Sequence, residues 1–576
     1  MSTRRYWVGL LVGFVIVLGF QYSLASHIYS PVGLIHGDSF LVYFILKHWM
    51  HVFTTLQWQQ VITMPMFFGY EGSLFFTDHH FLVAVFTYPL FLLSRNIVFS
   101  AHVIVILTII ASFISMYTLI WHMTKSAKAG IISGILFVLN PFIFARYPDQ
   151  LNLLSLQWIP LIFLFFELAI RTPRSTYLLW FFIALSAQLL TSLNYSVMVS
   201  VVLPVYMVIR SIQERFQWWS SIHIWTVIGC VLFVLTAGLT RYSYQRVYEK
   251  YPLNRSVEVA KTYAAIPSDW LFTSELNVLY GGLKQAAAAR FPHTVRIGID
   301  AEHSLFPGIV MIVFVIASVF LSRIFPDRNR YAVLVAAMLF AWVLSLGPAV
   351  WTPGGTGTHW VYGLLYRLNP YLHDIRATSR FAVFVYFFAA WIAAYVWQYV
   401  EKRVSGRVAA CIAAVVIGLI LMEYWNKPLE FTEISPGEHA VYGVIQERDD
   451  IRVILEYPIG NRISYPFPQA RSEDLDARYL LWATLLHSKT LFNGYSGFIP
   501  EEYYLRANAL SVNFPTDEKL ALLQQWGVDA IIVHRNEFVV STQFDSVCTA
   551  LKSRGVPILI DAGDDIVFDL TAWSGR

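Results

Sequence analysis

Two short acidic segments near the start of the chain carry the side chains best suited to chemistry. Asp38 follows the first long apolar run, and Asp78 stands two positions before His80. A carboxylate is costly to bury in lipid, about 2.5–3.5 kcal/mol for Asp at mid-membrane, so acids beside a bilayer usually mark a function. Asp38 is therefore a candidate general base or metal ligand. The alternative is that it only caps the helix that follows.

The second segment is a candidate metal site. On an extended backbone, Asp78 and His80 point to the same side because one residue separates them. Such a pair can bind a divalent ion with Asp38 as a third ligand. Carboxylates suit Mg²⁺ or Mn²⁺, and a mixed imidazole and carboxylate set favours Mn²⁺ or Zn²⁺. The alternative is an N-cap, Thr77 or Asp78, before a helix whose preceding histidines are solvated.

Arginines in later loops are candidate anion ligands. Arg146 can bind a phosphate through two hydrogen bonds, or it can pair with Asp149 and hold a turn. Arg376 and Arg380 precede a later apolar run, where a phosphate-bearing partner would explain them. An ion pair between Asp374 and Arg376 would explain them equally well.

The composition is typical of a polytopic membrane protein. Of 576 residues, 57% are hydrophobic and 14% are charged, whereas soluble proteins have about 25% charged residues. The net charge of +4 is modest, and we expect no nucleic-acid partner. No Walker loop, dinucleotide-binding glycine pattern or Gly-x-Ser-x-Gly occurs, which disfavours ATP-driven transport and serine-hydrolase chemistry.

Apolar runs of spanning length predict about eleven transmembrane helices. The first follows Arg4 and Arg5 as in a signal peptide, but no Ala-x-Ala site follows it, so we expect an uncleaved helix. A further run, 81–94, contains Pro89 and has about 14 residues, so we expect it to be interfacial or re-entrant. The eleven runs are 6–25, 98–121, 130–145, 151–170, 176–193, 195–212, 223–240, 305–322, 331–348, 381–400 and 408–425.

Basic residues predict the orientation of these helices. If 81–94 does not cross, every short loop on the side of the N-terminus contains Lys or Arg, and the positive-inside rule places that side in the cytoplasm. We therefore expect a multi-pass plasma-membrane protein with a cytoplasmic N-terminus. The long segments expected outside are 26–97, 241–304, 349–380 and 426–576.

Two domains are predicted, a transmembrane domain over 1–425 and an extracytoplasmic α/β domain over 426–576. In the second, 452–457, 528–534 and 566–570 read as strands, and 516–525 reads as a helix capped by Thr516. In the first external loop, 26–97, we expect residues 39–49 to form a helix along the interface. Its Lys47 and His48 should face water.

The order of these features resembles the GT-C superfamily of integral-membrane glycosyltransferases. That superfamily has a catalytic acid in the first external loop, just after the first helix, with juxtamembrane helices before the second. Asp38, its following helix, Asp78-x-His80 and the run 81–94 match this layout in order. More closely, the chain resembles a group of little-characterised bacterial and archaeal multi-spanning proteins. The shared segments here are Gly37–Phe40, Gln150–Leu161, Ile375–Phe381 and Asn493–Pro500.

The expected fold has about 11 transmembrane helices from the apolar runs, a soluble α/β tail, and the juxtamembrane helices that the resemblance implies. The resemblance also implies transfer of a sugar from a polyprenyl-phosphate carrier to an extracytoplasmic glycan, lipid or protein acceptor, inverting the sugar, with Asp38 as base. A divalent metal, Mn²⁺ or Mg²⁺, would bind at Asp78 and His80. The substrate-binding residues would be Arg146, Gln150, Arg376 and Arg380.

Two other functions remain open. A transporter or flippase of a polar lipid tends to place charges inside helices near mid-bilayer, and here Glu167 is a rare charge of that kind. A catalytically inactive GT-C-like scaffold for envelope assembly is the other alternative.

Overall fold

A computed structural model places the residues of the chain in two compact units. The first, here called the helical unit, contains Met1–Ser26, Val103–Tyr242 and Asn254–Pro428. The second, called the loop–tail unit, contains His27–His102, Ser243–Leu253 and Leu429–Arg576. The segment 26–97, predicted as the first external loop, thus falls almost wholly in the same unit as the tail. The described residues are 2–32, 37–172, 174–251, 257–291, 301–325, 327–348, 360–368, 372–373, 375–434, 436–460 and 475–574.

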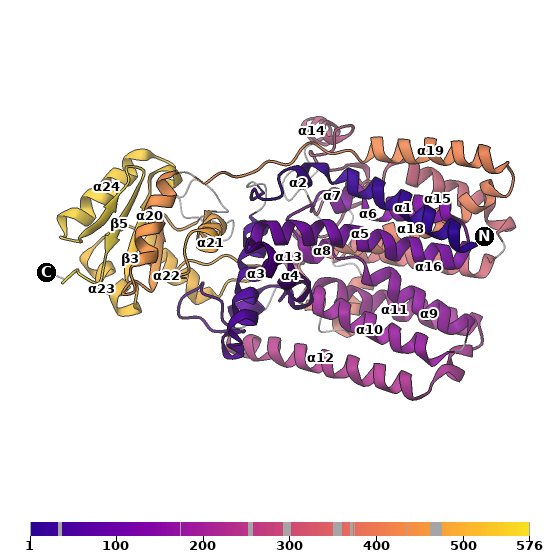
Figure 1. Cartoon of the computed structure of the whole chain (residues 1–576), viewed down its shortest axis with the longest axis horizontal. Coiled ribbons are helices and arrows are strands. Elements are labelled where there is room, and N and C mark those ends of the chain that lie inside the picture. The colour runs from indigo at the N-terminus through magenta and orange to yellow at the C-terminus, as the bar shows by residue number, and fades with distance from the viewer. Residues whose placement is uncertain are drawn as a thin grey trace. The chain divides into compact units, whose positions relative to one another are not determined.

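The helical unit packs around α18 (Ala382–Glu401), which is buried along most of its length. Helices α6, α15 and α16 contact α18, and α9 contacts α10; in Figure 1 the long helices of this unit run alongside one another. The other helices that lie wholly or mostly in this unit are α1 (Ser2–Phe20), α2 (Tyr22–Ser26), α5 (Ile97–Thr124), α6 (Ala127–Val138), α7 (Pro141–Phe144), α8 (Leu151–Leu154), α9 (Trp158–Arg171), α10 (Ser175–Thr191), α11 (Leu193–Gln213), α12 (Ile224–Lys250), α13 (Val257–Thr262), α14 (Gly281–Arg290), α15 (Ile309–Leu321), α16 (Arg328–Ser345), α17 (Trp360–Leu368) and α19 (Gly406–Glu423).

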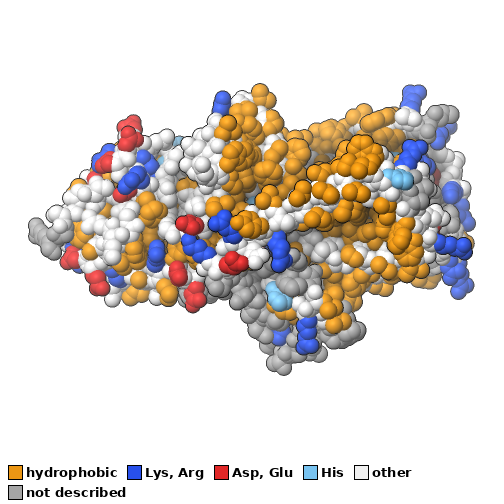
Figure 2. Space-filling model, turned by 90° about the horizontal axis from the view of Figure 1, so that it is seen from below, with side chains coloured by type: hydrophobic (Ala, Val, Ile, Leu, Met, Phe, Trp, Pro, Cys, Tyr) orange, Lys and Arg blue, Asp and Glu red, His pale blue; other side chains and the backbone are white. Residues whose placement is uncertain are grey.

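Within the described residues, eight helices are long and apolar enough to cross a membrane. Helices occur at all eleven predicted positions, but α10 has 17 residues, α15 has 13, and α16 falls outside the set of eight. Helix α4 (Phe81–Ser94) is a separate 14-residue helix containing Pro89, matching the length predicted for a segment that does not span. Figure 2 shows hydrophobic side chains over much of the visible surface of the helical unit, with Lys and Arg gathered at one end.

The predicted span 130–145 is interrupted, because proline cannot donate a backbone hydrogen bond. Helix α6 ends at Val138 and α7 starts at Pro141. The Asn140 side chain caps α7 by accepting a hydrogen bond from the Ile143 N–H at 3.1 Å. The side-chain amide of Asn140 also donates to the Phe137 carbonyl at 2.6 Å. One asparagine therefore satisfies backbone groups on both sides of the break.

The tail of the loop–tail unit contains a five-stranded mixed sheet in the order β2-β1-β3-β5-β4. Strand β1 is parallel to β2 and β3, whereas β5 is antiparallel to β3 and β4. The three predicted strands and the predicted helix with its Thr516 cap are confirmed. The elements of this unit are α3 (Asp38–Thr55), α4, α20 (Pro436–Glu447), β1 (Val453–Tyr457), α21 (Leu475–Leu485), β2 (Thr490–Leu491), α22 (Glu501–Ser511), α23 (Asp517–Trp526), β3 (Ala530–His534), α24 (Ser541–Ser553), β4 (Ile558–Asp561) and β5 (Asp565–Asp569).

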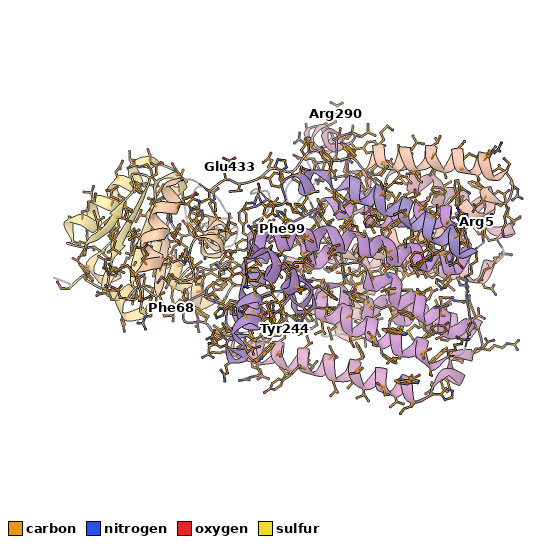
Figure 3. All side chains as sticks on the ribbon, in the orientation of Figure 1. Arg5, Phe68, Phe99, Tyr244, Arg290 and Glu433 are labelled. Atoms are coloured by element: carbon orange, nitrogen blue, oxygen red, sulfur yellow. The ribbon has the colours of Figure 1, made fainter. Side chains whose placement is uncertain are left out.

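The first loop is joined to the tail by backbone hydrogen bonds near the edge strand β2. Main-chain groups of the loop bond to main-chain groups on and just after β2. A buried main-chain group without a hydrogen-bond partner is unfavourable, so these bonds favour the contact. Phe68, labelled in Figure 3, belongs to this seam. The bonds are Leu491 N to Pro65 O at 3.0 Å, Phe68 N to Leu491 O at 3.1 Å, Phe67 N to Asn493 O at 3.0 Å and Phe498 N to Phe76 O at 2.9 Å.

A buried histidine links three strands of the sheet. His534 on β3 contacts Asp565 on β5 through Nδ1 and Glu456 on β1 through Nε2, each at 2.7 Å. The Tyr442 hydroxyl donates to the other oxygen of Glu456 at 2.9 Å. Burial lowers the pKa of His534, but the two carboxylates outweigh burial and raise this pKa to about 10. The charged imidazole therefore holds two strands on either side of β3.

Replacing His534 should destabilise the protein strongly, because His534→Leu leaves Glu456 buried without its cation. We expect a loss of about 3–5 kcal/mol in the free energy of unfolding. In the wild type, the contribution is fully present below about pH 6.5, the ordinary histidine value, and is lost as the pH rises through about 10. Unfolding of the purified protein, followed by intrinsic fluorescence between pH 6 and 11, measures both effects.

Lys552→Ala is the matched control. Its ion pair with Asp561 spans 3.8 Å between two half-exposed side chains, so it should change stability by less than about 1 kcal/mol. A similar pH dependence in wild type and His534→Leu would contradict the assignment.

Candidate active site

Asp38 is the first residue of α3 and follows a glycine in a left-handed conformation. Gly37 is the N-cap, with φ of 63°, a region that residues with a Cβ rarely adopt. Because Gly37 occupies the N-cap position, the alternative in which Asp38 serves only as an N-cap is wrong. Asp38 remains half-buried in the first turn, where the helix dipole stabilises a negative charge.

A tyrosine from the tail contacts this acid. The Tyr495 hydroxyl donates a hydrogen bond to Asp38 Oδ1 at 3.2 Å. Tyr495 lies in the segment Asn493–Pro500, which the sequence singled out only by resemblance and to which it assigned no role. The bond fixes the orientation of one carboxylate oxygen. An acid and a phenol from distant parts of the sequence are thus brought together within the loop–tail unit.

His80 lies beside the same acid. Its side chain is 3% exposed, and among the described residues its Nδ1 atom has no hydrogen-bond partner. Burial lowers the pKa of His80 to about 4, although the Asp38 charge acts in the opposite direction. His80 is therefore neutral at pH 7. Its backbone has φ of 51° as the N-cap of α4, so the predicted extended conformation is wrong at this position.

Asp78 and His80 both act on the pKa of His79, which stands between them. The Asp78 charge raises the pKa of His79, whose net value is nevertheless lowered to about 4 by burial. Tyr244, labelled in Figure 3, donates to the Thr77 carbonyl at 2.7 Å. Across the described parts of the chain, no three or more His, Cys, Asp or Glu side chains are grouped to hold a metal ion. The structure thus provides no three-ligand site, and a metal at Asp78 and His80 stays a prediction.

Helix α3 is buried more deeply than predicted. Lys47 does not face open water: it donates to three main-chain carbonyls at the end of α21, including that of Thr484 at 2.5 Å. Burial lowers the pKa of Lys47 to about 8. His48 is buried, with Nε2 3.0 Å from the Val61 carbonyl. The prediction that both residues face water is wrong because the tail and the rest of the first loop cover this side of α3.

In the helical unit, two predicted phosphate ligands bind a carboxylate. Arg146 Nη2 lies 2.7 Å from Glu302 Oε2, and Arg380 Nη2 lies 2.6 Å from Oε1. The Ser379 hydroxyl also donates to Glu302 Oε2 at 2.7 Å. Burial raises the pKa of Glu302, but Arg380 and Arg146 outweigh it and hold this pKa well below its usual range. The alternative prediction paired Arg146 with Asp149, but the acid that pairs with Arg146 is Glu302.

The other two predicted substrate residues are Arg376 and Gln150. Arg376 is half-buried, with its guanidinium 4.5 Å from the centroid of the Tyr263 ring. Gln150 is half-buried and precedes α8. Asp374, the alternative partner of Arg376, lies outside the described residues. A substrate role for Arg146, Gln150, Arg376 and Arg380 stays a prediction.

Three residues were not predicted in the roles that the structure gives them: Tyr495 as a partner of Asp38, Lys47 as a link to the tail, and Glu302 as a partner of two arginines. Of the three, Tyr495 could have been found from the sequence, because it stands in the segment Asn493–Pro500. Glu302 is one acid in a long loop, and nothing local marks it as the partner of two distant arginines.

Neutralising Glu302 should destabilise the helical unit, because Glu302→Gln leaves two buried guanidinium groups without a counter-charge. We expect a loss of about 3–5 kcal/mol, measured as thermal unfolding of the purified protein in detergent. Glu401→Gln is the control: its pair with Lys128 is about one-quarter exposed on both sides, so it should cost at most about 1 kcal/mol. Equal losses in the two variants would refute the buried triad.

No family model matches the sequence, and no curated protein matches it. Among solved structures, the mycobacterial arabinofuranosyltransferase AftD matches with a TM-score of 0.59 and 12% identity, over 98% of this chain and 40% of AftD. ArnT from Cupriavidus metallidurans, bound to undecaprenyl phosphate, gives 0.42 and 14% over 98% of both chains. AglB from Archaeoglobus fulgidus, with dolichol-phosphate, gives 0.42 and 11% over 92% of this chain and 69% of AglB. This chain spans less than half the length of AftD, and the similarity is one of fold.

Proposed function

We propose that this chain, whose fold is similar to that of the arabinofuranosyltransferase AftD, is a GT-C glycosyltransferase that transfers a sugar from a polyprenyl-phosphate carrier to an extracytoplasmic acceptor. One observation supports this most directly. Asp38, the acid that follows the first helix, keeps part of its surface exposed at the start of α3, with Tyr495 on one oxygen. A general base needs this combination of access and fixed orientation.

The proposed reaction uses Asp38 as the base. The acceptor hydroxyl gives its proton to the Asp38 carboxylate while its oxygen attacks C1 of the sugar. The bond from C1 to the phosphate oxygen breaks, and the phosphate leaves on the lipid with the electron pair. Attack from the face opposite the phosphate inverts the configuration at C1. A positioned base contributes roughly 10²–10⁴-fold to such a rate.

The leaving phosphate carries negative charge, which cationic or hydrogen-bonding side chains must stabilise. We assign this role to the predicted residues Arg146, Gln150, Arg376 and Arg380. Of the three arginines, Arg376 contacts an aromatic ring, whereas Glu302 already neutralises Arg146 and Arg380. The acceptor is a glycan, lipid or protein.

We also propose the orientation expected from the basic loops. The N-terminus and the short Lys- and Arg-containing loops lie in the cytoplasm, and the α/β domain lies outside. The acceptor is then taken from the extracytoplasmic side, at the cell envelope.

A transporter is the weaker alternative. A transporter tends to carry charges inside its helices, and Glu167 is a rare charge of this kind, but it is fully buried and neutralised. The Arg210 Nε and Arg330 Nη2 atoms lie 2.8 and 3.1 Å from Glu167 oxygens, and the Tyr206 hydroxyl donates at 2.7 Å. A charge paired in this way joins α9, α11 and α16, which explains its presence without a transported ligand.

Asp38→Asn should lower sugar transfer by about 10²–10⁴-fold while membrane insertion and thermal stability persist. The measurement is transfer from a panel of polyprenyl-phosphate sugars to envelope glycan, lipid and protein fractions. Asp545→Asn is a suitable control, because this exposed acid pairs with Arg535 in the tail and should not change transfer. Full activity in Asp38→Asn would remove the proposed base, and lipid movement without sugar transfer would favour a transporter.

A divalent ion at Asp78 and His80 is a separate proposal. Mg²⁺ is often bound by one or two protein ligands, and substrate phosphate and water complete its coordination. Such an ion would offset negative charge on the leaving phosphate. Since the described residues offer no three-ligand group, binding should require the phosphate donor.

Chelation should therefore abolish transfer, and added Mn²⁺ or Mg²⁺ should restore it. In Asp78→Asn, the Mn²⁺ concentration for half-restoration should rise at least about tenfold. Transfer that continues unchanged in excess EDTA would exclude this metal role while leaving Asp38 as the base.

A further inference from the structure

We propose that the C-terminal α/β domain is a built-in part of the active site, in which Tyr495 and Lys47 act as positioning residues for Asp38. Both side chains join α3 to the tail, one at the acid itself and one farther along the helix. The catalytic meaning of this arrangement rests on the function proposed above, whereas the positioning can be tested without it.

Lys47 is the first attachment. Its ammonium group lies 3.3, 2.5 and 3.3 Å from the carbonyl oxygens of Ala483, Thr484 and His487. The last carbonyls of a helix have no partners within the helix, and a cation there is favoured by the helix dipole. Lys47 therefore caps the C-terminus of α21, and α21 packs against α3.

Tyr495 is the second attachment, and its own position is fixed on both sides. Before it, the Asn493 side chain exchanges two hydrogen bonds with the Glu456 backbone, at 2.8 and 3.0 Å. After it, Phe498 N donates to the Phe76 carbonyl at 2.9 Å. A Cβ at Gly494 would lie 2.2 Å from the Phe67 ring, so only glycine allows the backbone to approach the first loop this closely.

Two attachments restrict α3 more than one would. Lys47 and Asp38 are nine positions apart on α3, about 14 Å along the helix axis. The first amides of a helix have few partners inside the helix, so the N-terminal turn is the part most prone to fray. The bond from Tyr495 restrains this turn at the residue whose orientation matters for proton transfer. The tail thus acts on the base itself.

Hydrogen exchange of the full-length protein, measured by mass spectrometry, tests the positioning without any substrate. In Tyr495→Phe, the Phe40 and Leu41 amides, which donate to the Gly37 carbonyl, should exchange about tenfold faster. Tyr479→Phe is the matched control, because it removes a tail hydroxyl that donates to the Pro458 carbonyl at 2.6 Å. It should leave α3 unchanged.

Lys47 provides a second, independent variant. Lys47→Met should accelerate exchange along α3, and Lys47→Arg should restore protection because a guanidinium can also donate to the α21 carbonyls. Lys489→Met is the control, since Lys489 donates to the Arg448 carbonyl at 2.6 Å within the tail. Unchanged α3 exchange in Tyr495→Phe or in Lys47→Met would overturn the proposal.

Kinetics then separate this proposal from the proposed function. Tyr495→Phe should lower kcat about tenfold with KM unchanged, because orientation of the base matters only in the transition state. A change in KM alone would overturn the positioning role. If Asp38→Asn transfers sugar normally while Tyr495→Phe still loosens α3, the proposed function fails and the structural role of the tail stands.

Discussion

The seam between the first loop and the edge of the tail sheet is the constraint on which the candidate site depends. Main-chain hydrogen bonds around Phe67, Phe68 and Leu491 satisfy groups that neither segment could satisfy alone. This seam brings the Asn493–Pro500 segment to the start of α3, where Tyr495 meets Asp38. The seam thereby supplies the acid at the start of α3 with a hydrogen-bond donor from the tail.

Three of the buried charges elsewhere are met by opposite charge from a different element. Glu302 joins two arginines that lie far apart in the sequence, and Glu167 joins α9 to α11 and α16. His534 sits between acids on the two neighbouring strands. Because an uncompensated buried charge is so unfavourable, these pairs specify which elements become neighbours inside each unit.

The sequence predicted local features well because local patterns encode them. Apolar run length gave the position of each spanning helix, and the cap at Thr516 correctly marked the start of α23. The sequence located Asp38 at the start of a helix. It could not show whether Asp38 is the N-cap or lies in the first turn, because that depends on the left-handed conformation of Gly37. The interruption at Pro141 followed from chemistry that the run length of 130–145 alone did not show.

What could not be predicted was which distant residue meets which. An arginine near the end of a helix looks the same whether it binds a phosphate or, like Arg146, a protein carboxylate. The sequence placed Asp78 and His80 on one extended segment, whereas His80 adopts a left-handed conformation and the Asp38 charge acts on its pKa. Likewise, Lys47 was predicted to face water because the carbonyls that it contacts at the end of α21 are far away in the sequence.

The contact between Asp38 and Tyr495 also constrains biosynthesis, since its two members are 457 positions apart. The ribosome adds roughly 5–20 residues per second, so the loop emerges on the order of 20 to 90 seconds before its tyrosine. During that interval the nascent chain exposes α3 without its cover. The site is completed only when the last part of the polypeptide has been made and delivered to the same side of the bilayer, so a chain that stalls earlier is inserted but incomplete.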